Sequence, residues 1–146
     1  MVVGLFLVSV LLAFSGFYYS QWMPRFQLER AVQQVTNDIQ LARIKAISQN
    51  CFYRLQFSPV DDSYRLERES LNGPSNWPGV LEGLCRQFSQ ADNPYHCPGV
   101  KLESSSSHPI FSPRGTVVGT TIILKSAAMK RVITLSTQGR VKVQEG

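Results

Sequence analysis

The side chains best suited to catalysis or metal binding are few in this 146-residue chain, which has two histidines and three cysteines. Cys85, His96, Cys97 and His108 are the residue types of a two-cysteine, two-histidine zinc site, but their spacing fits no common zinc pattern. A Cys97 nucleophile activated by His96 is also disfavoured, because adjacent residues in an extended loop seldom face each other. We therefore expect no metal site, no cofactor and no enzyme active site.

Cys85 and Cys97 bracket CRQFSQADNPYHC, a polar segment without strong hydrophobic periodicity. A Cys85–Cys97 disulfide would close this segment and stabilise the fold by about 3 kcal/mol on chain-entropy grounds. Such a bond requires an oxidising compartment. We expect this disulfide, and we expect Cys51, which begins the apolar run CFYRLQF, to be a small buried side chain.

The formal net charge is +5, and the basic residues are scattered, which favours a solvated basic surface over a dedicated polyanion site. One grouping is notable on two predicted strands near the C-terminus: Lys130, Arg131, Arg140 and Lys142. Pairing of these strands would gather the cations into a small patch for nucleic-acid phosphates. The alternative is an ordinary solvated strand face, which the lack of aromatic residues for base stacking in this stretch favours.

The positioning elements begin with MVVGLFLVSVLLAFSGFYYSQWMP, residues 1–24, which contain no ionisable side chain. As a helix this run would be about 36 Å long, against about 30 Å for the hydrocarbon core of a bilayer. It ends in aromatic residues of the kind found at membrane interfaces, and then in Arg25. We predict an uncut transmembrane helix at 1–24; the alternative, a cleaved signal peptide, is supported by the triplet Ala13-Phe14-Ser15.

An amphipathic pattern continues over residues 25–50. Its apolar residues are three or four positions apart: Leu28, Val32, Val35, Ile39, Ala42 and Ala46. This is one face of a helix, and the charged residues Glu29, Arg30, Asp38, Arg43 and Lys45 fall off it. Because the stripe is short for a coiled coil, we expect it to pack on the chain's own sheet. Pro24 is expected to bend one long helix, and Asn50 to end it.

Residues 51–146 carry strand and turn patterns and are predicted to form a β-rich globular domain. CFYRLQF and YRLERE predict a hairpin around SPVDDS. Residues 70–107 are rich in Gly, Pro and Ser, which indicates a loop with short strands at best. Three antiparallel strands are predicted at 117–124, 130–136 and 140–143. The predicted fold class is α+β, with a long N-terminal helix packed on an antiparallel β-sheet domain.

Three phrases in this layout resemble the minor pilins and pseudopilins of the GspH/FimT type. LARIKAISQN (41–50) is similar to the end of that family's long helix, FSPRG (111–115) to its F-x-x-x-G turn, and VITLSTQGRVKV (132–143) to its closing hairpin. The match as a whole covers nearly the whole chain, and its phrases lie in the expected order. The resemblance implies a pilin-like fold and a structural subunit near the tip of a type IV pilus or a type II secretion pseudopilus.

The resemblance also implies partners and a location. The N-terminal helix would assemble with other pilins or pseudopilins, after storage in the bacterial inner membrane as a single-pass protein with its C-terminal domain in the periplasm. Secreted cargo and DNA are further implied partners, because some FimT-like minor pilins bind DNA through a basic C-terminal segment. DNA uptake through Lys130, Arg131, Arg140 and Lys142 is therefore the alternative function.

Members of this family begin with a short basic leader, a cleavage-site glycine and a glutamate early in the mature helix. The resemblance places Met1 just after that glutamate, so either the natural start lies upstream or the protein is an anchor-only relative of the family. The family's carboxylate is thought to neutralise the terminal amine of a neighbouring subunit, since an unpaired charge in hydrocarbon is costly.

Overall fold

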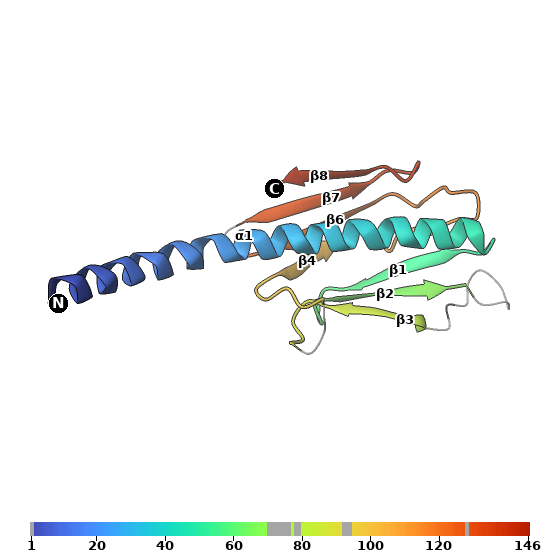
Figure 1. Ribbon diagram of the computed structural model, residues 1–146. Coiled ribbons are helices and arrows are strands. Elements are labelled where there is room, and N and C mark those ends of the chain that lie inside the picture. The colour runs from blue at the N-terminus through green and yellow to red at the C-terminus, as the bar shows by residue number, and fades with distance from the viewer. Residues whose placement is uncertain (1, 70–76, 78–79, 92–94, 128) are drawn as a thin grey trace.

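The computed structural model describes residues 2–69, 77, 80–91, 95–127 and 129–146, without the side chains of residues 2–3, 5–21 and 80–83. Within these residues, one helix, α1 (Val2–Ser48), lies against two antiparallel four-stranded sheets (Figure 1). Sheet A has the order β3-β2-β1-β5 and sheet B the order β4-β6-β7-β8. The strands are β1 (Tyr53–Ser58), β2 (Ser63–Arg68), β3 (Val80–Gln87), β4 (Lys101–Ser105), β5 (Ile110–Phe111), β6 (Thr120–Lys125), β7 (Lys130–Leu135) and β8 (Val141–Glu145). The predicted α+β class is confirmed.

Helix α1 is continuous through Pro24. Its first half extends beyond the sheets, and its second half lies along both of them (Figure 1). The predicted apolar stripe from Leu28 to Ala46 is confirmed, because each of its six members is at most 4% exposed. These side chains form one core with the inner faces of the two sheets, including Leu55 of β1 and Ile133 of β7.

Asn50 ends the helix, as predicted. Its φ is 51°, in the left-handed region that asparagine tolerates better than most residues. The amide of Asn50 donates to the carbonyl of Ile47 at 3.4 Å, and the amide of Cys51 donates to the carbonyl of Ala46 at 3.3 Å. This pair of bonds is a Schellman cap, which turns the chain back so that β1 starts against the helix that precedes it.

The predicted hairpin is confirmed as β1 and β2, with Phe57 opposite Tyr64. Inward side chains alternate along β1, where Tyr53, Leu55 and Phe57 are buried. The connecting turn includes Asp62 at a φ of 48°. Its Oδ1 accepts a hydrogen bond from the amide of Leu102 at 2.9 Å, which joins the end of sheet A to β4 in sheet B.

Residues 70–107 contain more strand than the sequence indicates. The eight-residue strand β3 pairs with β2, with a register shift between Arg65 and Glu67, and β4 pairs with β6. The segment VLEGLCRQ of β3 has few β-branched or aromatic residues, so pairing with β2 rather than propensity makes it a strand. The expectation of a loop with short strands at best is therefore wrong for 80–87. Residues 70–76, 78–79 and 92–94 of that stretch lie outside the described residues.

The C-terminal strands are confirmed as the meander β6, β7 and β8, although β6 begins three residues later than predicted. They form one sheet with β4, separate from the β1–β2 hairpin, so the single predicted sheet is divided in two. Helix α1 covers both sheets and joins them into one domain (Figure 1).

Candidate functional site

The face of α1 opposite the core carries exposed apolar side chains near the middle of the helix and near its C-terminal end. Trp22 and Phe26 are 69% and 68% exposed, and Ile44 and Ile47 are 62% and 50% exposed. At about 100° per residue, these four positions lie within about 60° of one another around the helix. The middle of the same face is polar and exposed, with Gln33, Asn37 and Gln40. We call these seven residues the outer stripe; it is an exposed face that the core leaves unused.

A buried ion pair fixes α1 to sheet A. Asp38 is 4% exposed and accepts two hydrogen bonds from Arg86 of β3, from Nε at 2.6 Å and from Nη2 at 3.0 Å. The hydroxyl of Tyr64 on β2 also donates to Asp38, at 2.7 Å. Burial, together with the nearby negative charge of Asp38, raises the pKa of Tyr64 well above its ordinary value. The hydroxyl therefore stays protonated and keeps donating.

The expectation that Asp38 falls off the buried face was wrong. It lies three residues after Val35 and four before Ala42, spacings that place it on the same side of the helix as the core stripe. That spacing was the signal available in the sequence. The partner Arg86 had no such signal, because its strand was not predicted.

A second ion-pair group fixes α1 to sheet B. Arg131 of β7 donates to Glu29 of α1 at 2.9 Å through Nε and to Glu145 of β8 at 2.5 Å through Nη1. Hydrogen bonds to the two carboxylates raise the pKa of Arg131. Nearby, the Ser126 hydroxyl donates to the carbonyl of Pro24 at 3.3 Å. Arg131 is thus a structural residue, only 9% exposed.

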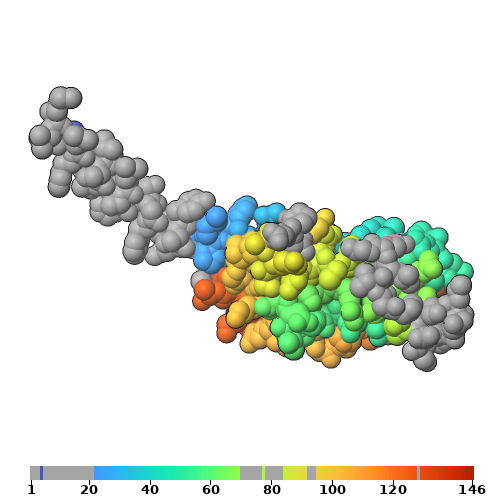
Figure 2. Space-filling view, turned by 90° about the horizontal axis from the view of Figure 1, so that it is seen from below, coloured from blue at the N-terminus to red at the C-terminus, as the bar shows by residue number. Residues whose placement is uncertain are grey.

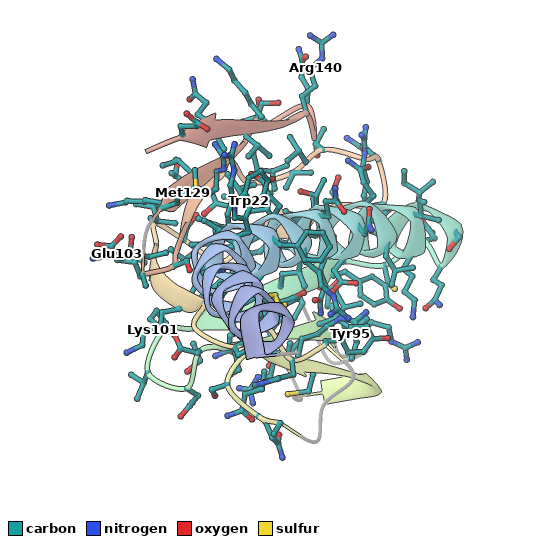
Figure 3. All side chains as sticks on the ribbon, turned by 60° about the vertical axis from the view of Figure 1, so that its left-hand side comes forward. Trp22, Tyr95, Lys101, Glu103, Met129 and Arg140 are labelled. Carbon is teal, nitrogen blue, oxygen red and sulfur yellow. The ribbon has the colours of Figure 1, made fainter. Side chains whose placement is uncertain are left out.

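The structure separates the predicted nucleic-acid residues Lys130, Arg131, Arg140 and Lys142. Lys142 is opposite Thr134, so Lys130 and Arg131 lie at one end of the hairpin and Arg140 at the other. Lys130 pairs with Glu103 at 2.9 Å. Arg140 points away from the rest of the molecule (Figure 3). The four cations do not form one patch, and DNA binding stays a prediction.

The three phrases of the family resemblance meet at the C-terminal end of α1. Gly115 and Gly139 have φ values of 80° and 78°. A Cβ built on Gly139 would lie 3.0 Å from Cζ of Arg43, and one built on Gly115 would lie 3.4 Å from Cδ1 of Ile47. Both turns therefore use glycine for its backbone conformation, and at Gly139 a Cβ would in addition be crowded by the helix. The phrases could be recognised singly, but their meeting depends on the tertiary fold.

The structure does not bring Cys85 and Cys97 together. Cys85 is exposed and Cys97 is buried in the core, and both are free thiols. On β3, Arg86 reaches Asp38 on the helix side, so the neighbouring Cys85 points to the opposite face, where it lines a small surface cavity with Arg65. The disulfide is not formed in this structure and stays a prediction. Cys51 is half-buried and packs against the core.

The histidines have separate surroundings. His108 accepts a hydrogen bond at Nδ1 from the amide of Phe57 at 3.3 Å, while Nδ1 of His96 is buried without a hydrogen-bond partner. Among the described residues, no three His, Cys, Asp or Glu side chains are grouped so that they could hold a metal ion.

Within the residues that the structure describes, no helix is long and apolar enough to cross a membrane. The predicted anchor at 1–24 falls mostly on residues whose side chains lie outside the described set, so it stays a prediction.

Comparison with known families gives a clear match. The model of the family described as Type II transport protein GspH matches residues 31–139, which is more than half of the 146-residue chain. The match includes α1 from Ala31 onward and the strands β1 to β7. A search of curated protein sequences finds no significant match.

Solved structures share the fold. The minor pseudopilin EpsH from the type 2 secretion system of Vibrio cholerae matches with a TM-score of 0.64 and 9% identity, over 82% of this chain and 97% of that chain. A second EpsH structure matches with a TM-score of 0.62 and 10% identity, over 82% of this chain and 95% of that chain. The type IV minor pilin FimU of Pseudomonas aeruginosa PAO1 matches with a TM-score of 0.58 and 16% identity, over 84% of this chain and 92% of that chain. At these low sequence identities, the similarity to the solved structures shows a shared fold alone.

Proposed function

This chain belongs to the GspH family of type II transport proteins, and from this we propose that it is a non-enzymatic structural subunit of a type IV filament. The filament is a pilus or a type II secretion pseudopilus, and the subunit stands near its tip. The observation that carries the proposal is the division of α1, of which one half is embedded in the domain while the other extends beyond it (Figure 1).

The two halves of α1 have different tasks in this proposal. Residues 1–24 hold the subunit in the bacterial inner membrane as a single-pass anchor, with the 51–146 domain in the periplasm, and pack among other pilin helices after assembly. Residues 25–50 carry the domain. The outer stripe supplies apolar contact to neighbouring subunits, because a row of large exposed apolar side chains is typical of an interaction surface.

The two ion-pair groups make the helix and the domain move together. Asp38 joins α1 to sheet A through Arg86, and Glu29 joins it to sheet B through Arg131. Because each pair has a member on the helix and a member on a sheet, a displacement of the helix along the filament is transmitted directly to the β domain. The β domain is then displayed toward secreted cargo or partner subunits.

The test is recovery of the chain in filaments sheared from the producing cells and quantified by mass spectrometry. Leu11→Arg places a charge in the predicted anchor, at a cost of about 3 kcal/mol near a bilayer centre. We expect it to remove the chain from both membrane and filament fractions. Gln138→Arg, in an exposed turn, is the matched control and should leave both unchanged. Normal recovery of Leu11→Arg would contradict the proposal.

DNA binding remains a second candidate, favoured by the exposed Arg140 at the end of the closing hairpin (Figure 3). Retention of DNA by the full chain in detergent should weaken with salt and be lost in the Arg140→Ala, Lys142→Ala double variant. The matched control is Lys130→Ala, because Lys130 is already paired with Glu103. Equal loss in the control would exclude a site at Arg140.

A further inference from the structure

A cleft of about 310 Å³ lies between α1 and the end of β3. Gln33, Gln34 and Asn37 of the helix form one wall, and Arg86 and Tyr95 form the other. Figure 3 shows Tyr95 beside the helix, and Figure 2 shows the yellow segment after β3 next to the blue part of α1, near the middle of that helix. Gln33 and Asn37 belong to the outer stripe, so the cleft opens into the polar middle of that face.

The cleft contains one carboxylate, and its charge is already neutralised. Asp38 accepts both hydrogen bonds of Arg86 and a third from Tyr64. The ring of Tyr95 covers this pair from the cleft side, with its centroid 3.4 Å from Cζ of Arg86. Asp38 and Arg86 thus cancel each other, and neither is left to attract a ligand of opposite charge.

The groups that remain are donors. Arg30 at the rim is exposed and has no ion pair within the described part of the chain. Nε2 of Gln34 is buried and has no hydrogen-bond partner. A buried N–H without an acceptor costs free energy that a bound acceptor would recover. A free guanidinium next to an unpaired amide N–H is a combination that suits a carboxylate, because the planar fork of arginine matches its two oxygens.

We propose that this cleft binds an Asp or Glu side chain of a neighbouring filament subunit, through Arg30 and the amide of Gln34. The proposal rests on the function proposed above, because it places a neighbouring helix along the outer stripe. The cleft lies between the two exposed apolar pairs of that stripe, Trp22 with Phe26 and Ile44 with Ile47. A neighbour that packs on both pairs must cross the cleft.

The bound carboxylate sets the axial position of the neighbour. The hydrophobic effect is non-directional and scales with the apolar area buried, so it fixes the stagger of two helices less sharply than a hydrogen-bonded charge pair does. A carboxylate must meet Arg30 at hydrogen-bond distance, so its place in the neighbour's sequence selects one stagger and one partner. Charged contacts at protein interfaces commonly fix register and suppress wrong partners in this way.

The experiment uses the full chain in the producing cells, with a photo-crosslinking amino acid at Gln33 in the cleft mouth or at Ile44 in the outer stripe. Cross-linked peptides are identified by mass spectrometry. We expect position 33 to cross-link to a filament subunit, with an Asp or Glu next to the cross-linked residue. Arg30→Glu should lower this yield by about tenfold, the size of effect expected for reversing one member of a partly buried charge pair. Arg30→Lys keeps the charge but loses the planar fork, so it should lower the yield by less than Arg30→Glu does.

The matched control is Arg25→Glu, an exposed cation on the same helix outside the cleft, which should leave the yield at position 33 unchanged. Equal loss in Arg25→Glu and Arg30→Glu, or cross-linked peptides without an acidic residue, would overturn the proposal. Cross-linking at position 44 reports on assembly alone. If position 44 cross-links to a filament subunit but position 33 does not, only the carboxylate site is overturned. If neither position cross-links, the proposed function is overturned too.

Discussion

At the scale of single residues, the attachment of α1 depends most on Asp38. Asp38→Ala leaves the guanidinium of Arg86 and the hydroxyl of Tyr64 without their acceptor at a largely buried position. We expect a loss of about 3 kcal/mol in the free energy of unfolding, the usual cost of removing one member of a buried ion pair. Urea denaturation of the full chain in detergent measures it. Gln40→Ala, on the exposed face of the same helix, should change stability by less than about 0.5 kcal/mol.

Tyr64 makes the fold sensitive to alkaline pH. Burial and the Asp38 charge raise its pKa in the folded state well above 10.0, whereas the unfolded chain has the ordinary value. The stabilisation is therefore complete below pH 10 and is lost as the pH rises toward the folded pKa. Tyr64→Phe should be less stable at pH 8 by about 1 kcal/mol and should show a smaller further loss above pH 10. If the Tyr64→Phe variant lost stability above pH 10 as steeply as the unsubstituted chain does, Tyr64 would not be a source of the alkaline sensitivity.

The residues of the candidate site were only partly predictable. The apolar half of the outer stripe follows from helical periodicity, because Trp22, Phe26, Ile44 and Ile47 recur on one face. The α1–β3 cleft could not be foreseen, because Arg86 and Tyr95 come from a region predicted as loop. The separation of the four cations could not be foreseen for a related reason, since no local pattern indicates that Arg131 pairs with Glu29, 102 positions away.

At the scale of elements, the turn at Gly139 links the closing hairpin to the helix. Gly139→Ala introduces a Cβ at positive φ and 3.0 Å from the guanidinium of Arg43. Gly99 has the same φ of 78° with nothing within 4 Å, so Gly99→Ala measures the backbone cost alone. We expect about 1 kcal/mol for Gly99→Ala and a somewhat larger loss for Gly139→Ala in thermal unfolding, because the guanidinium of Arg43 must also shift by a few tenths of an ångström.

A second substitution separates the two contributions at Gly139. Arg43→Ala removes the guanidinium that a new Cβ would meet, so adding Gly139→Ala to it should cost no more than Gly99→Ala does. If the two substitutions were simply additive, the close approach of Arg43 would have no energetic role.

Elements were predictable where their signal is local. The core stripe of α1, its end at Asn50 and the β1–β2 hairpin each depend on residues close in sequence, and each is confirmed. Strand β3 depends on β2 for its hydrogen bonds, and the division into two sheets depends on which strands meet across the domain. The hydrophobic periodicity of a segment does not indicate which other strands it will pair with.

At the scale of the whole molecule, the exposed ends of the outer stripe should govern assembly without affecting folding. Ile44→Asp with Ile47→Asp replaces side chains that are 62% and 50% exposed, so the unfolding curve should change little. Incorporation into filaments should fall about tenfold, because exposed apolar anchors dominate interface energies. Val60→Asp, at 92% exposed on the far β1–β2 turn, is the matched control and should assemble normally. Normal assembly of the double variant would remove the outer stripe as an interface.

The account as a whole depends on the first 24 residues remaining attached to the domain that α1 carries. The most direct test is the intact mass of the chain recovered from the cells that produce it, measured separately for membrane, filament and soluble fractions. The account predicts a species that retains residues 1–24 and is found in the membrane and filament fractions. A soluble species that begins near Gly16 would contradict it, because neither anchoring nor helix packing could then occur.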